Sequence, residues 1–61
     1  MGPETLKSIL NQKHRDAGLY LEEPDDHLVH LKRGDKILTS FYQTVVTVVQ
    51  IRKEADYWMD K

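Results

Sequence analysis

Residues 27–42 read HLVHLKRGDKILTSFY and decide the fold that the chain is expected to adopt. They contain two runs of leucine, β-branched and aromatic residues, separated by Gly34 and Asp35. Such runs on either side of a short turn that contains glycine are typical of an antiparallel β-hairpin. Because side chains alternate along a strand, this hairpin is predicted to have one apolar face.

The length of the turn decides which side chains share a face. A three-residue loop over residues 33–35 gathers the apolar side chains on one face. A two-residue loop sets Leu31 against Leu38 and Leu28 against Phe41, which places these two apolar pairs on opposite faces. The sequence therefore predicts the three-residue loop. Its pairs are Lys32 with Lys36, Leu31 with Ile37, Val29 with Thr39, and His27 with Phe41.

A helix is predicted over residues 3–17, before the hairpin. Leu6, Ile9 and Leu10 recur there at helical spacing and give the helix an apolar face. Gly18 follows directly and supplies the left-handed residue that commonly closes a helix. The next segment, residues 19–26, is predicted to be a short edge strand that runs into a loop, because it contains a proline and four acidic residues.

A second helix is predicted over residues 48–60, after the hairpin. Thr47 and Gln50 have the spacing of a capping box, in which each side chain binds the backbone N–H of the other residue. The valines of this region also favour a strand. The competing prediction is therefore a third strand at 44–49 followed by a shorter helix.

Residues 1–61 are expected to form one small α+β domain with the order α-β-β-α, in which two helices cover one face of the hairpin. A core this small predicts a marginally stable monomer or a dimer that buries more surface. The expected core side chains are Leu6, Ile9, Leu10, Val29, Leu31, Ile37, Phe41, Ile51, Ala55 and Trp58.

The composition excludes several classes of protein. The chain has 61 residues, no cysteine and a net charge of −1, so disulfides and thiolate zinc sites are excluded. A charge this close to zero argues against a protein whose main task is to coat nucleic acid or an anionic membrane. No apolar run is long enough for a membrane span, and no secretory signal pattern is present. A cytoplasmic location is the expectation.

The segment EEPDDHLVH, residues 22–30, concentrates candidate metal ligands. Asp25, Asp26, His27 and His30 all carry donor atoms that a divalent cation accepts. On an extended strand, however, His27 and His30 point to opposite faces because they are three positions apart. A charged loop is therefore the preferred interpretation, and no metal site is predicted.

No enzymatic activity and no cofactor are expected. No glycine-flanked nucleophile surrounds the serines, and the three glycines are too scattered to form a phosphate-binding loop. A core of this size also leaves little room for a cleft that perturbs the pKa of an acid or a base.

Aromatic residues and surplus valines favour a protein-binding role. Tyrosine is enriched where proteins meet, and the valines add apolar area beyond the helix stripes. The predicted protein-binding residues are Tyr20, Tyr42, Val45, Val46 and Tyr57. The chain is therefore expected to be a small interaction or regulatory module that binds a protein partner or a second copy of itself.

The alternative function is that of a nucleic-acid-associated accessory protein. Lys32, Arg33 and Lys36 surround the hairpin turn and would form a basic tip that contacts phosphates. Because no basic helix or interleaved aromatic residue extends the tip, this hypothesis ranks second.

Overall fold

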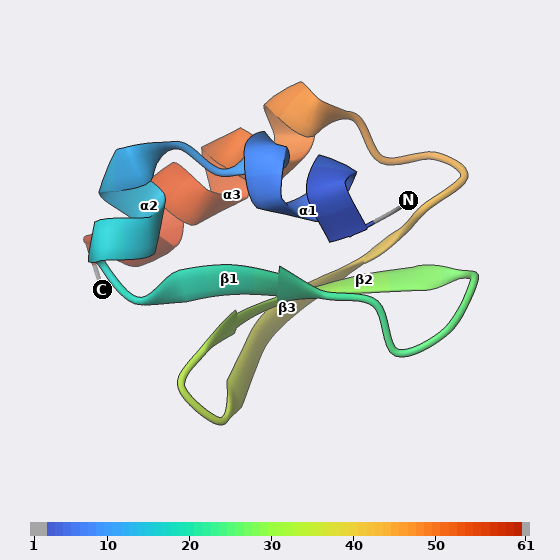
Figure 1. The fold of residues 1–61 in the computed structure, drawn as a ribbon, viewed down its shortest axis with the longest axis horizontal. Coiled ribbons are helices and arrows are strands. Elements are labelled where there is room, and N and C mark those ends of the chain that lie inside the picture. The colour runs from blue at the N-terminus through green and yellow to red at the C-terminus, as the bar shows by residue number, and fades with distance from the viewer. Residues whose placement is uncertain (1–2, 61) are drawn as a thin grey trace.

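A computed structural model describes residues 3–60 and places three helices over one face of a three-stranded antiparallel sheet (Figure 1). The helices are α1 (Pro3–Ile9), α2 (Gln12–Asp16) and α3 (Val48–Met59), and the strands are β1 (Leu19–Glu22), β2 (Leu28–Arg33) and β3 (Lys36–Tyr42). β2 lies between β1 and β3. The α+β fold class and the helix-covered hairpin are confirmed, and the short edge strand is β1.

The single helix predicted over residues 3–17 is wrong, because the chain breaks between α1 and α2. Asn11 has an extended backbone, with φ −77° and ψ 165°, and precedes the first residue of α2. The break leaves the backbone carbonyl of Ile9 outside the helical ladder, where it accepts a hydrogen bond from Nε of Arg52 at 2.7 Å. A contact from α3 thus satisfies the end of α1.

Gly18 closes α2 with φ +87°, a conformation that side chains with a Cβ rarely adopt. A Cβ added there would lie 3.7 Å from Cγ of Arg33, which is an ordinary contact. We therefore expect Gly18→Ala to lower the free energy of unfolding by about 1–2 kcal/mol through backbone strain alone. Urea unfolding measures this change. Gly18→Asn is the control, because asparagine tolerates this conformation; equal losses in both variants would contradict the prediction.

The three-residue hairpin loop is wrong, and the rejected two-residue turn is present. Arg33 pairs with Lys36, and Gly34 occupies the first central position with φ +61°, as a type II′ turn requires. The register then shifts by one residue between Leu31 and Lys32 of β2. The prediction failed because it assumed one uninterrupted register along the whole hairpin.

The register shift is a β-bulge that returns the apolar residues to one face. Beyond it, Val29 pairs with Phe41, and the side chain of Leu38 packs against the core. Ile37, which precedes the bulge, is 54% exposed, so its predicted place in the core is wrong. The bulge therefore exchanges Ile37 for Leu38 in the apolar layer.

The helix predicted after the hairpin is confirmed as α3. Oγ1 of Thr47 accepts from the backbone N–H of Gln50 at 3.2 Å, and Oε1 of Gln50 accepts from the backbone N–H of Thr47 at 2.9 Å. This capping box satisfies donors that the first turn leaves free. The competing strand at 44–49 is wrong, because those residues form a turn and the start of the helix.

The core lies between the sheet and the helices. Fully or nearly fully buried apolar side chains are Ile9, Leu10, Leu19, Val29, Leu31, Ile51 and Ala55. All of these except Val29 form one contiguous cluster, and the half-buried residues Leu6, Phe41 and Trp58 pack against that cluster, as predicted. Leu19 joins the core although it was not among the predicted core residues. Within residues 3–60, no helix is both long enough and apolar enough to cross a membrane.

Candidate functional site

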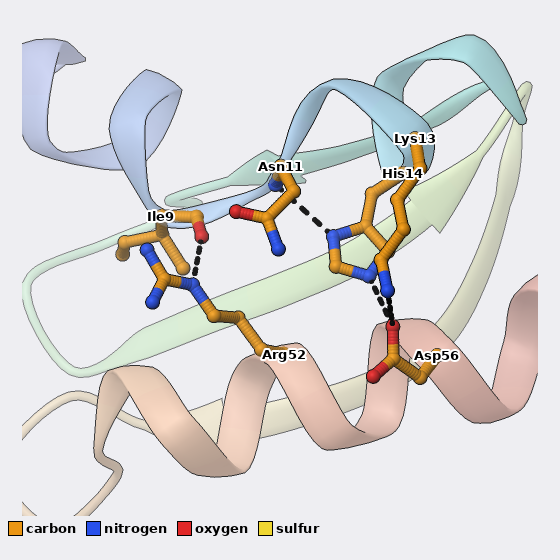
Figure 2. A network of polar contacts seen from close by, with 6 residues as sticks. All are labelled: Ile9, Asn11, Lys13, His14, Arg52 and Asp56. Carbon is orange, nitrogen blue, oxygen red and sulfur yellow. Dashed lines mark hydrogen bonds and ion pairs between the residues drawn. The ribbon is translucent and has the colours of Figure 1, made fainter.

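A polar network joins α2 to α3 through His14 (Figure 2). The imidazole of His14 is fully buried. Its Nδ1 accepts a hydrogen bond from the backbone N–H of Asn11 at 3.1 Å, so the ring proton is on Nε2. Nε2–H then donates to Oδ1 of Asp56 at 2.6 Å. Both ring nitrogens of His14 therefore have partners.

Asp56 also forms an ion pair with Lys13 of α2. Nζ of Lys13 lies 3.3 Å from the same Oδ1 that binds His14. The hydrogen bond from His14, followed by the hydrogen bond from Lys13, lowers the pKa of the Asp56 carboxyl below its ordinary value. The carboxylate is thus held in its charged form at the junction of the two helices.

A histidine paired with an aspartate is also the composition of an acid–base dyad. A catalytic base must come within hydrogen-bond reach of the proton that it abstracts. In this structure the His14 ring has no exposed surface, and its nitrogens are taken by Asn11 and Asp56. The geometry therefore assigns the pair to helix packing.

A hollow of about 540 Å³, lined by both apolar and polar side chains, opens between the end of β3 and the start of α3. We call it the β3–α3 hollow. The residues that line it are Phe41, Tyr42, Val45, Val46, Gln50, Lys53 and Glu54. The carbonyl of Tyr42 accepts from the backbone N–H groups of Val45 and Val46, at 3.1 and 3.0 Å. This turn holds both valines beside the tyrosine, and Lys53 and Glu54 of α3 also line the hollow.

The structure brings together three of the five predicted protein-binding residues. Tyr42, Val45 and Val46 all line the β3–α3 hollow. Tyr20 lies on β1, and its hydroxyl donates to the backbone carbonyl of Gly34 at 2.7 Å. Tyr57 lies on α3 and packs edge to face on Trp58, with ring centroids 5.3 Å apart. The hollow is thus the surface where the predicted residues converge.

Two of the four candidate metal ligands, Asp25 and His30, make other side-chain contacts. Oδ1 of Asp25 accepts from the backbone N–H groups of His27 and Leu28, at 2.7 and 3.1 Å. The first of these bonds lowers the pKa of the Asp25 carboxyl. Nδ1 of His30 lies 2.7 Å from Oγ of Ser40. Among residues 6–60, whose side chains the structure describes, no group of three or more histidine, cysteine or acidic side chains is placed to hold a metal, and Asp26 joins none.

The three cations of the predicted basic tip do not share one surface. Lys32 lies on the uncovered face of the sheet, where Nζ is 3.4 Å from Oε1 of Glu22 and 5.7 Å from the ring centroid of Tyr20. Arg33 points to the helical side, and its Nη1 donates to the backbone carbonyl of Trp58 at 3.2 Å. Lys36 alone remains exposed at the turn. This arrangement weakens the nucleic-acid hypothesis.

Sequence reasoning missed two polar residues that organise these surfaces. His14 follows Leu10 by four positions, and that spacing on an apolar helix face was the signal that it is buried. Nε2 of Gln43 donates to the carbonyls of Asp25 and Leu28, at 3.0 and 3.1 Å, and so ties the β1–β2 loop to the end of β3. The sequence around Gln43 contains no signal for this role.

Comparison of the chain with models of protein families, with curated proteins and with solved structures gives no match. Its function is therefore inferred from the chemistry of its surfaces. Among these, the β3–α3 hollow combines exposed apolar area with a partly charged rim.

Proposed function

We propose that the chain is a small, non-enzymatic, cytoplasmic interaction module whose β3–α3 hollow binds an apolar segment of a protein partner, a second copy of the chain included. The observation that carries this proposal is the exposure of Tyr42 and Val45, which are 66% and 71% accessible beside the hollow. Exposed apolar side chains that border a concavity are a recurring feature of protein-binding surfaces.

The chemistry of the hollow suits a peptide segment. Tyr42 offers a large ring with few rotatable bonds, so ordering it on binding costs little conformational entropy. Val45 and Val46 extend the apolar wall. Lys53 and Glu54 bring both signs of charge to the rim, where they orient a partner without excluding it by net charge.

The packing of the chain supports a surface role for these residues. The accessible surface is 4139 Å². A compact monomer of 7.2 kDa has about 4,100 Å². The chain thus reaches ordinary compactness without a partner. Tyr42 and Val45 are therefore available for binding and are not needed to complete the core, whereas Val46 is half-buried and also packs against it.

The test combines self-association with partner binding. Sedimentation equilibrium from low micromolar to millimolar concentration measures whether the chain associates with a second copy of itself. For a different partner, a protein captured from the source cells is re-expressed, purified and titrated with the chain by calorimetry. Tyr42→Ala and Val45→Ala are each expected to weaken the association about tenfold or more, as truncated interface anchors do. Val49→Ala is the matched control, because Val49 is exposed on α3 and does not line the hollow.

Two results would overturn the proposal. One is a chain that stays monomeric throughout and retains no purified partner. The other is an association whose affinity is the same in Tyr42→Ala and Val45→Ala as in the control variant Val49→Ala.

A further inference from the structure

A second hollow, of about 270 Å³, lies between the helices α1 and α2 and the edge strand β1. We call it the α1–β1 hollow. Its walls are mainly leucine side chains, and its charged groups are one lysine and one arginine. The residues that line it are Leu6, Lys7, Leu10, Arg15, Tyr20 and Leu21. It shares no residue with the β3–α3 hollow.

The charge at this hollow is positive and is not neutralised by a described carboxylate. The ion pairs among the described residues join Lys13 and His14 to Asp56, and Lys32 to Glu22. Lys7 and Arg15 take part in none of them. Asp16, which follows Arg15 in the chain, accepts from Nε2 of Gln12 at 2.8 Å. Among the side chains that the structure describes, the hollow thus offers two cations without an ion-pair partner beside an apolar wall.

The guanidinium of Arg15 is held in position before any ligand binds. Nη1 donates to the backbone carbonyl of Lys7 at 2.9 Å, and Nη2 donates to Oε1 of Gln12 at 3.2 Å. A guanidinium has about five N–H donors, so these two bonds leave about three for an acceptor. Because its planar group is fixed, Arg15 loses less freedom when it binds an anion.

We propose that the α1–β1 hollow binds the C-terminal residue of a partner polypeptide, with an apolar side chain against Leu6, Leu10 and Leu21 and the terminal carboxylate on Lys7 and Arg15. A C-terminal residue carries both groups on one Cα, whereas the carboxylate of an aspartate or glutamate side chain has no large apolar group beside it. The volume lies just below the range of about 300–1,000 Å³ that is typical of ligand pockets. It therefore suits one side chain and its carboxylate better than a long acyl chain.

The test is a titration of the isotope-labelled chain, followed by backbone and methyl NMR signals. The probes are a short acetylated peptide that ends in leucine, as the free acid and as the C-terminal amide, and octanoate as a free apolar anion. The free acid is expected to shift the signals of Leu6, Leu10 and Leu21. It is also expected to bind about tenfold more tightly than the amide, because charge-assisted hydrogen bonds to the carboxylate are lost in the amide.

Variants assign the binding to the two cations. Lys7→Gln with Arg15→Gln is expected to reduce the affinity for the free acid to that for the amide. Lys36→Gln removes one positive charge from an exposed position outside both hollows and is expected to leave the affinity unchanged, so it is the matched control for the single variant Lys7→Gln. Lys7→Gln alone is a second variant, expected to preserve the fold, because the Lys7 side chain makes no hydrogen bond or ion pair with residues 6–60, whose side chains the structure describes.

Three outcomes would overturn the inference. They are the absence of shifts with the free acid, equal affinity for the acid and the amide, and binding of octanoate without binding of the peptide. Tyr42→Ala is expected to leave the peptide affinity unchanged, because Tyr42 lies outside the α1–β1 hollow. This experiment therefore tests the α1–β1 hollow independently of the function proposed for the β3–α3 hollow.

Discussion

Replacement of Ile51 by alanine is expected to lower the free energy of unfolding by about 2–5 kcal/mol. Ile51 is fully buried in the cluster that joins α3 to Ile9 of α1 and Leu31 of β2. Truncation removes apolar contacts and leaves a cavity that the surrounding elements only partly close. A single core in a domain of this size rarely supplies more than about 3–5 kcal/mol, so the variant should be largely unfolded.

If the Ile51→Ala variant still folds, urea unfolding monitored by circular dichroism measures this loss of stability. If the variant does not fold, its circular dichroism spectrum in buffer without urea shows the loss directly. Val49→Ala is the matched control, because Val49 lies on the same helix and is 62% exposed. Its change should stay within about 0.5 kcal/mol. Equal stability of Ile51→Ala and Val49→Ala would mean that the buried residues of α3, Ile51 and Ala55, do not hold this helix to the sheet.

The prediction of α3 from the sequence succeeded because its determinants are local. Thr47 and Gln50 are three positions apart, and their reciprocal hydrogen bonds need nothing outside one helical turn. The spacing of Ile51 and Ala55 then places both side chains on the face that packs against the sheet. Gly18 is another local case, since the end of α2 requires a positive φ whatever the rest of the chain does.

The hairpin register could not be predicted, because the bulge opposite Leu31 and Lys32 is a response to the helical layer. The turn at Gly34 begins a register that would carry apolar side chains to both faces. One extra residue in β3 brings Leu38 to the helices and leaves Ile37 outside. Only the packed structure shows that burying apolar area on one face offsets the loss of regular pairing.

The candidate site was predicted in part for a similar reason. Tyr42, Val45 and Val46 are close in sequence, so a turn between them suffices to form one wall of the β3–α3 hollow. Its other wall comes from α3, and the α1–β1 hollow needs Lys7 and Arg15 to meet across the break at Asn11. Because that break was not predicted, no pattern in the sequence indicated that those two cations lie close together.

Replacement of His14 by alanine is expected to lower the free energy of unfolding by about 2–4 kcal/mol. The variant loses a buried ring, leaves the backbone N–H of Asn11 without its acceptor, and removes the donor to Asp56. Urea unfolding measures the change. Lys13→Ala is the matched control from the same helix, because Lys13 also contacts Asp56 but has an exposed side chain. Its loss should stay below about 1 kcal/mol.

The contact between His14 and Asp56 also predicts how stability depends on pH. The pKa of the Asp56 carboxyl is lower in the folded chain than its ordinary value, chiefly through the hydrogen bond from His14. The unfolded chain therefore takes up a proton first as the solution is acidified. The stabilisation by Asp56 is fully present above the ordinary carboxyl pKa of about 4 and is lost as the pH falls through the lowered value.

Asp56→Asn isolates this charge, because an asparagine oxygen can still accept from Nε2–H of His14. The stability difference between the wild type and Asp56→Asn is expected to be constant from neutral pH to about pH 5 and to shrink below about pH 4. In the His14→Ala background the same difference should be smaller at every pH, because the largest cause of the lowered pKa is gone. Two results would contradict this prediction: a stability difference between the wild type and Asp56→Asn that is as large at low pH as at neutral pH, or one that is equally large in the His14→Ala background. Either result would mean that the buried imidazole of His14 does not join α2 to α3 through the charge of Asp56.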